Sequence, residues 1–233
     1  MSAISVVNRS SVAAAEVEAV LTAVNKQVSD HFEPWWDIRG WLTLVPVNEP
    51  VPGNSVIYVT DEADVPGALG YHDLYASGMP YGFVFTQLSN QVGDGWSVTF
   101  SHEVLELLAD PEVNVTCRGS HPKQRRKVFH WREMCDAVQA RKYQLDGIWV
   151  SDFVLPLYFT EREEPSKPTS YMEAAGLAPR VESFKIAPGG YIGFFDPLLG
   201  QDTTVMADSE AMRRAAAKQP FDLGRRAWWR LTR

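Results

Sequence analysis

The stretch from Trp96 to Ala109 constrains the fold of this chain more than any other segment, because its apolar residues recur at helical spacing. Asp110-Pro111 follows directly, and the residue before a proline is disfavoured in helical geometry, so we expect the helix to end there. His102 and Glu106 stand four residues apart and therefore on one face of this helix. An imidazole and a carboxylate placed in this way can ligate one metal ion, and Glu103 beside them is suited to act as a general base.

The pattern His-Glu-x-x-Glu differs from the His-Glu-x-x-His motif of zinc peptidases in its last residue alone. Zinc accepts carboxylate oxygen as well as imidazole nitrogen, so Glu106 can replace the second histidine. Carboxylate ligands also suit other divalent metals, so the sequence predicts Zn²⁺ or another divalent ion. Asp110 lies about two turns beyond His102, too far to ligate the same ion, and we expect it to orient a ligand or to close the helix. An alternative stays open, because glutamates on an amphipathic helix commonly form a solvated face.

The residues before this helix indicate one further helix and several strands. Apolar residues at helical spacing predict a helix over residues 11–32. Runs rich in β-branched and aromatic residues predict strands at 41–47, 56–60 and 80–87. The sequence therefore predicts an α+β fold, with an N-terminal helix and a small mixed sheet preceding the helix that carries His102.

This order of elements resembles that of the zincin metallopeptidases. In the zincin fold, the last strand before the active-site helix is the sheet edge above the metal, and the substrate pairs with it as an added strand. The resemblance implies a peptide or protein substrate and a substrate-binding edge strand. The residues of that strand would be Phe83, Val84, Phe85 and Thr86.

The residues downstream of the helix extend the resemblance. After Asp110-Pro111 comes a Glu-x-x-Asp segment, Glu133 to Asp136, and this succession is similar to that of a group of zincin-like proteins with an HExxE helix. The resemblance implies that His102 and Glu106 bind zinc, with Asp136 or Glu133 as the third ligand. The hydrogen-bond donor for a developing oxyanion is left open among five residues. They are Tyr143, Tyr158, Tyr191, His72 and His130.

We expect a single zincin-like domain over residues 1–205, with a sheet part at 1–111 and an irregular C-terminal part at 112–205. The basic residues of 112–132 are expected to form a loop. Residues 206–233 are expected to form a basic, tryptophan-containing helix or tail. This tail would contact a protein partner, a second copy of the chain or the acidic body of the protein itself.

Composition and charge narrow the class of function. The chain has 233 residues, 45% of them hydrophobic, which suffices for a buried core. Its net charge of −7 gives no general attraction to nucleic acid or to an anionic membrane, so neither is expected as a partner. The N-terminus lacks the apolar core of a classical signal peptide and no apolar run has the length of a membrane span, so we expect a soluble protein without a classical export signal, in the cytoplasm or in a compartment that the sequence leaves open.

Together these features predict a zinc-dependent hydrolase that cleaves peptide bonds, with Glu103 as general base on metal-bound water. The alternative is a non-catalytic structural or assembly protein on a zincin-derived fold, with a vestigial or structural metal site. An open coordination position would distinguish the two, since a catalytic metal keeps one position for water.

Overall fold

A computed structural model describes residues 2–47, 49, 55–64, 68–162 and 164–208 of the chain. The chain forms two compact units. The first consists of Met1–Val113 together with Lys142–Ser151, and the second of Asn114–Arg141 together with Asp152–Arg233. The hairpin at residues 142–151 therefore belongs to the first unit, although it lies far downstream in the sequence.

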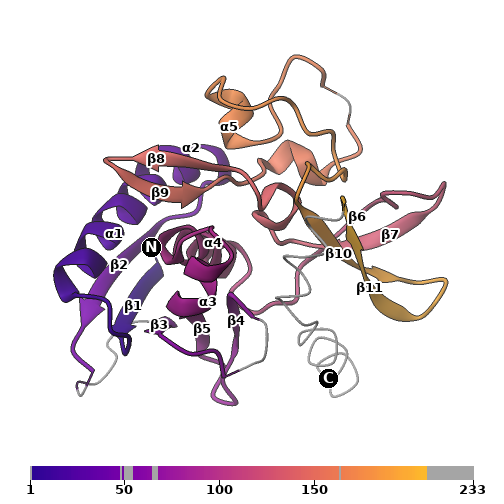
Figure 1. The fold of residues 1–233 in the computed structure, drawn as a ribbon. Coiled ribbons are helices and arrows are strands. Elements are labelled where there is room, and N and C mark those ends of the chain that lie inside the picture. The colour runs from indigo at the N-terminus through magenta and orange to yellow at the C-terminus, as the bar shows by residue number, and fades with distance from the viewer. Residues whose placement is uncertain (1, 48, 50–54, 65–67, 163, 209–233) are drawn as a thin grey trace. The chain divides into compact units, whose positions relative to one another are not determined.

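The first unit is built on a five-stranded mixed sheet in the order β2-β1-β3-β5-β4 (Figure 1). The first four of these strands are parallel, and β4 pairs antiparallel with β5. In β3, five consecutive residues are buried, as expected for an inner parallel strand that is covered on both faces. The strands are β1 (Ser2–Asn8), β2 (Gly40–Val45), β3 (Ser55–Thr60), β4 (Gly70–Leu74) and β5 (Pro80–Phe85).

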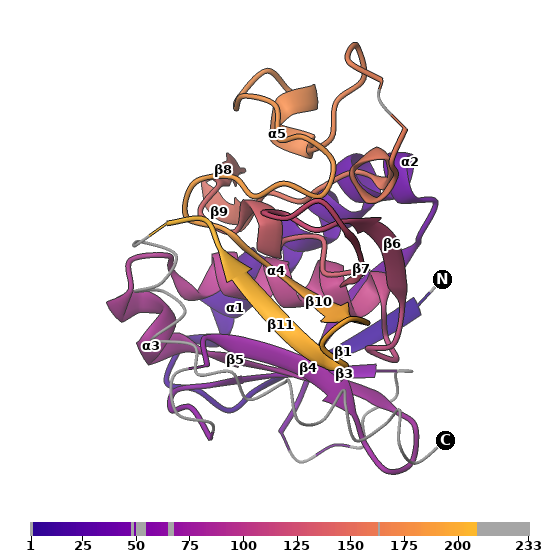
Figure 2. The same cartoon turned by 90° about the vertical axis from the view of Figure 1, so that its right-hand side faces the viewer.

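The helices of the first unit gather on one face of this sheet (Figure 2). α4 packs against both β4 and β5, and α1 packs against β2. The long helix predicted over residues 11–32 divides into α1 (Ala14–Lys26) and the π-helical turn η1 (Gln27–Phe32), which leads into α2 (Glu33–Trp36). The remaining elements are α3 (Thr86–Gln91), α4 (Trp96–Ala109) and the hairpin of β8 (Lys142–Leu145) and β9 (Ile148–Ser151).

The predicted edge strand is wrong in its position. Phe83, Val84 and Phe85 lie in β5, which is an inner strand with β3 on one side and β4 on the other. Thr86 begins α3 and is not in a strand. The terminal strand on this side of the sheet is β4, whose short Gly-Tyr-His-Asp-Leu sequence has too few apolar residues to stand out as a strand, and β2 is terminal on the other side.

The second unit contains a four-stranded antiparallel sheet in the order β11-β10-β7-β6. The loop predicted over residues 112–132 is wrong, because β6 and β7 form a hairpin there. Arg118 and Lys127 are exposed while Val128 and His130 are buried, so these two basic residues occupy the outer face of the two strands. The elements are β6 (Thr116–Ser120), β7 (Lys127–Trp131), η2 (Asp136–Val138), η3 (Pro156–Phe159), α5 (Tyr171–Ala174), β10 (Tyr191–Asp196) and β11 (Gln201–Met206).

The α+β class and the mixed sheet predicted from the sequence are confirmed. The basic tail is predicted over residues 206–233, of which 209–233 lie outside the described residues, and Met206 ends the strand β11. Within the described part of the chain, no helix combines the length and the apolar character that crossing a membrane requires.

Candidate metal centre

The helix α4 is buried on almost all sides, and this determines the environment of its polar residues. Its apolar residues are buried, among them Val104, Leu105 and Leu108. His102 and Glu106, on the same helix, are nevertheless buried, with exposed fractions of 5% and 4%. A carboxylate taken out of water is costly unless it has a partner, so the alternative of a solvated glutamate face is wrong.

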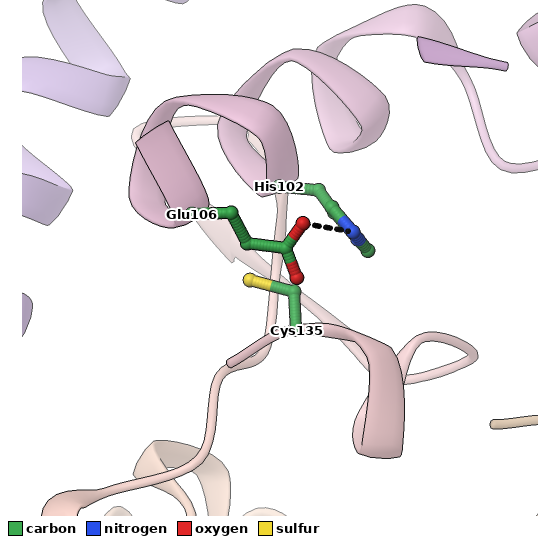
Figure 3. Close-up of side chains that lie close together, drawn as sticks. All are labelled: His102, Glu106 and Cys135. Carbon is green, nitrogen blue, oxygen red and sulfur yellow. Dashed lines mark ion pairs between the residues drawn. The ribbon is translucent and has the colours of Figure 1, made fainter. Parts of the chain in front are cut away.

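His102 and Glu106 are in direct contact along the helix. His102 Nε2 lies 3.1 Å from Glu106 Oε2, as expected for residues one turn apart. Figure 3 shows both side chains extending from the same side of α4. Cys135, also drawn in Figure 3, is a buried residue of the second unit. The predicted pair of ligand groups is therefore brought together by the helix itself.

Glu103 meets a histidine from the terminal strand of the sheet. Its Oε2 lies 3.4 Å from Nδ1 of His72 on β4, and both side chains are 4% exposed. Gly70, two residues earlier on β4, makes this approach possible. A Cβ at that position would stand 2.9 Å from Glu103 Oε1 and 2.8 Å from the carbonyl oxygen of Phe83. Only a glycine leaves room for the glutamate beside this strand.

Glu106 lies near two of the three histidines of the first unit, His72 and His102. A carboxylate oxygen of Glu106 is within 4.8 Å of a ring nitrogen of His102 and within 4.8 Å of a ring nitrogen of His72. His72 stands opposite Gly82 in the β4–β5 ladder, so no side chain of the neighbouring residue occupies the space beside it. Glu106 is thus close to each of these two imidazoles separately.

Buried hydrogen bonds fix α4 in the first unit. The backbone N–H of Ser151 on β9 donates to Ser101 Oγ over 2.7 Å, and Ser101 Oγ donates to the carbonyl of Val98. Near the start of the helix, Trp96 Nε1 donates to Glu16 on α1 over 2.8 Å. Because Ser101 precedes His102 directly, the β8–β9 hairpin sets the position of the candidate ligands.

Asp110 closes the helix, as one of its two predicted roles requires. Its backbone N–H donates to the carbonyl of Glu106 over 2.8 Å, and its backbone then leaves the helical region. The side chain is 2% exposed. Its other predicted role, that of orienting a metal ligand, stays a prediction.

Glu133 lies between β7 and η2 in the second unit, Asp136 begins η2, and both are buried. With Tyr158 they line a small cavity of about 10 Å³, which has room for about one water molecule. Burial, and to a smaller extent the charge of Asp136, raises the pKa of the Tyr158 hydroxyl far above its usual value. The assignment of Asp136 or Glu133 as the third ligand stays a prediction.

Several candidates for the oxyanion donor have other hydrogen bonds. Tyr143 accepts from Gln27 over 3.1 Å and contacts Nδ1 of His31 over 2.9 Å. Tyr158 donates to the carbonyl of Lys185 over 2.8 Å. His130 Nε2 contacts the carbonyl of Ser120 over 2.9 Å, and burial lowers the pKa of this histidine to about 4, so it is neutral at pH 7. Of the five, His72 is the one placed beside Glu103.

His72 is one of the five residues among which the sequence leaves the oxyanion donor open, and the motif spacing does not predict it as a metal ligand. The signal that would have found it is weak, because it requires recognising Gly70–Leu74 as a strand beside α4. Comparison of the chain with protein-family models, with curated proteins and with solved structures found no match. The function is therefore inferred from the residues and their geometry.

Proposed function

We propose that this protein is a metal-dependent hydrolase that cleaves peptide bonds, with the metal held by His102 and Glu106. The observation that carries the proposal is the buried contact of 3.1 Å between His102 Nε2 and Glu106 Oε2, with Glu103 on the same helix. Nitrogen and oxygen donors of this kind suit zinc, and the carboxylate also suits other divalent ions. The donor set in the first unit therefore fits the ion that the sequence predicts.

A bound divalent metal supplies Lewis-acid activation of a water molecule. The protein's part is to handle protons and to position the substrate. Glu103 is the general base, which accepts a proton from the attacking water and returns it to the leaving amine. Its burial beside His72 holds the carboxylate in one position, and Gly70 provides the space.

The terminal strand β4 supports a peptide as the substrate. An extended peptide can add to a terminal strand of a sheet by main-chain hydrogen bonds, and β4 is the terminal strand that packs against α4. It also carries His72, which contacts Glu103 over 3.4 Å. A peptide bound along β4 would therefore run beside the proposed general base.

A non-catalytic protein is the second candidate, and one observation favours it. Both buried glutamates of α4 are in contact with a histidine, Glu103 with His72 and Glu106 with His102. Such pairs give each buried carboxylate a polar partner without a metal. In that case the four residues would be structural.

The variant Glu103→Gln tests the proposed function. It keeps the size of the side chain and removes the base, so we expect hydrolysis of a peptide library to fall by at least a hundredfold while bound metal is retained. Glu18→Gln, an exposed glutamate on α1, is the matched control and should keep full activity. Full activity in Glu103→Gln would overturn the assignment of the general base.

A further inference from the structure

We propose that His31 forms a proton-sensitive contact that holds the β8–β9 hairpin on η1 and thereby fixes α4. The inference does not depend on the proposed function, because it concerns a part of the first unit that no metal would touch. It rests on one unbroken run of hydrogen bonds from η1 through the hairpin to α4. β9 lies at the middle of this run and packs against both α1 and α4 (Figure 1).

Gln27, the first residue of η1, joins the two strands of the hairpin. Its side chain is fully buried, and its Nε2 donates to the carbonyl of Ser151 on β9 over 2.9 Å and to the hydroxyl oxygen of Tyr143 on β8 over 3.1 Å. The backbone N–H of Ser151 in turn donates to Ser101 Oγ on α4 over 2.7 Å. The two backbone polar groups of Ser151 are therefore held from opposite sides, one by η1 and one by α4.

His31 contacts the same tyrosine from the same helical segment. Its Nδ1 lies 2.9 Å from the Tyr143 hydroxyl, and the centroids of the two rings are 5.6 Å apart. η1 is π-helical, with the N–H of Glu33 bonded to the carbonyl of Val28, and π-helical turns are frequent at functional sites. His31 is the member of the run whose ordinary pKa lies near neutral pH.

The groups that can only donate or only accept set the direction of these bonds. The Ser151 carbonyl is an acceptor, so the amide NH₂ of Gln27 faces it and gives its second proton to the Tyr143 oxygen. The Tyr143 hydroxyl then donates to His31 Nδ1, which must be unprotonated to accept. A proton taken up at Nδ1 makes this nitrogen a donor, so the bond from Tyr143 is lost. The run is therefore complete only while His31 is neutral.

The surroundings of His31 favour its neutral form. Burial has the largest effect on the pKa of His31 and lowers it, Asp30 on η1 opposes this effect, and Lys26 on α1 adds to it. Lys26 also pairs with Asp146 in the turn of the hairpin over 3.0 Å. Because the folded pKa lies below the unfolded value, the unfolded state binds more protons, and stability is lost as pH falls from about 6.5 towards the folded pKa.

Protonation of His31 at mildly acidic pH should loosen the hairpin from η1. Ser151 then loses the partner that fixes it from that side, and its bond to Ser101 no longer holds α4 against a rigid strand. Ser101 directly precedes His102, so the loss of order reaches the polar residues of α4. The contact thus makes local opening of the first unit responsive to pH.

Hydrogen exchange of the full chain, followed by NMR without added metal and corrected for the intrinsic pH dependence of exchange, tests this inference. We compare the protection of the Ser151 N–H in wild type and His31→Asn from about pH 7.5 to about pH 5.5, the range over which histidine titrates. Asparagine offers an oxygen that can accept from Tyr143 and does not titrate, so His31→Asn keeps the acceptor at every pH. His121→Asn is the matched control, a histidine of the second unit whose Nδ1 also accepts N–H groups.

We expect Ser151 protection to fall about threefold or more over this range in wild type and in His121→Asn, and His31→Asn to lose most of that fall. Wild-type protection that does not change with pH, or an equal fall in His31→Asn, would refute the inference.

Tyr143→Phe gives a second test, which decides the matter if His31→Asn does not fold. It removes the hydroxyl that donates to neutral His31, so we expect the pKa of His31, read from its ring-proton signal, to rise in this variant. An unchanged pKa would show that Tyr143 does not hold His31 in its neutral form. Neither test uses peptide hydrolysis or metal binding, so both outcomes are separate from those of the proposed function.

Discussion

Gly70→Ala perturbs the contact between β4 and α4 with a single methyl group. The added Cβ would lie 2.9 Å from Glu103 Oε1 and 2.8 Å from the carbonyl oxygen of Phe83, where ordinary contacts begin at 3.4 Å. The Phe83 carbonyl belongs to the neighbouring strand β5, so it cannot move without disturbing the β4–β5 ladder. The carboxylate of Glu103 must then shift away from the strand, because it is the more mobile of the two groups.

Overpacking of this kind costs about 1–3 kcal/mol. A loss of about 2 kcal/mol lowers the melting temperature of a chain of this size by about 4–8 °C. We also expect a fall of at least tenfold in kcat/KM for peptide hydrolysis, because Glu103 loses its position. Differential scanning calorimetry and a peptide-cleavage assay measure the two effects.

Gly82→Ala is the control for Gly70→Ala. This glycine lies on β5, and its added Cβ would meet its nearest atom, the carbonyl oxygen of Tyr71, at 3.2 Å. We expect a loss below about 1 kcal/mol, since the contact is only slightly short. A Gly70→Ala protein as stable and as active as Gly82→Ala would refute the close approach of Glu103 to β4.

Two further predictions concern single buried groups. Ser101→Ala removes the acceptor of the Ser151 N–H, so the free energy of unfolding should fall by about 1–3 kcal/mol in urea denaturation; no change would show that the bond does not hold α4. Burial raises the pKa of Asp152 to about 6, above its unfolded value, so the folded state binds more protons and wild-type stability should fall as pH rises from 4 to 6. Asp152→Asn should weaken that fall, because the amide does not titrate. Its oxygen can still accept the bonds from the N–H groups of Phe153 and Met172, so the fold is kept. An unchanged pH profile would contradict the raised pKa of Asp152.

The helix α4 could be predicted from the sequence because local signals agree there. Apolar residues at helical spacing begin near Trp96, and Asp110-Pro111 ends the helix. The spacing of His102 and Glu106 then fixes their contact, since residues four apart on a helix are neighbours whatever the tertiary structure. Burial of the two side chains could not be predicted, because it depends on the sheet and the hairpin that surround α4.

Strand order was not accessible from the sequence, and the position of the edge strand was predicted wrongly for that reason. The last strand before α4 along the chain is β5. The strand before it, β4, pairs antiparallel with β5 and takes the terminal position in the sheet. A five-residue strand with a glycine, a histidine and an aspartate has no clear alternation. The same missed strand carries His72, so the error in topology concealed a candidate ligand.

Charged residues concealed the first hairpin of the second unit. β6 and β7 contain Arg118 and Lys127, and the basic turn between the strands led to the prediction of a loop. The alternation of exposed and buried residues in β7, from Lys127 to His130, was the available signal. Short strands with a polar outer face are difficult to distinguish from loops when pairing partners are unknown.

Metal stoichiometry tests the central claim most directly. Elemental mass spectrometry of the purified full chain, after incubation with zinc and removal of free metal, gives the number of ions per chain for wild type and for His102→Ala. We expect about one zinc per wild-type chain and a loss of that ion in the variant, because His102 supplies one of the ligands on α4. Wild-type protein that holds no zinc, or a His102→Ala variant that retains the full amount, would contradict it.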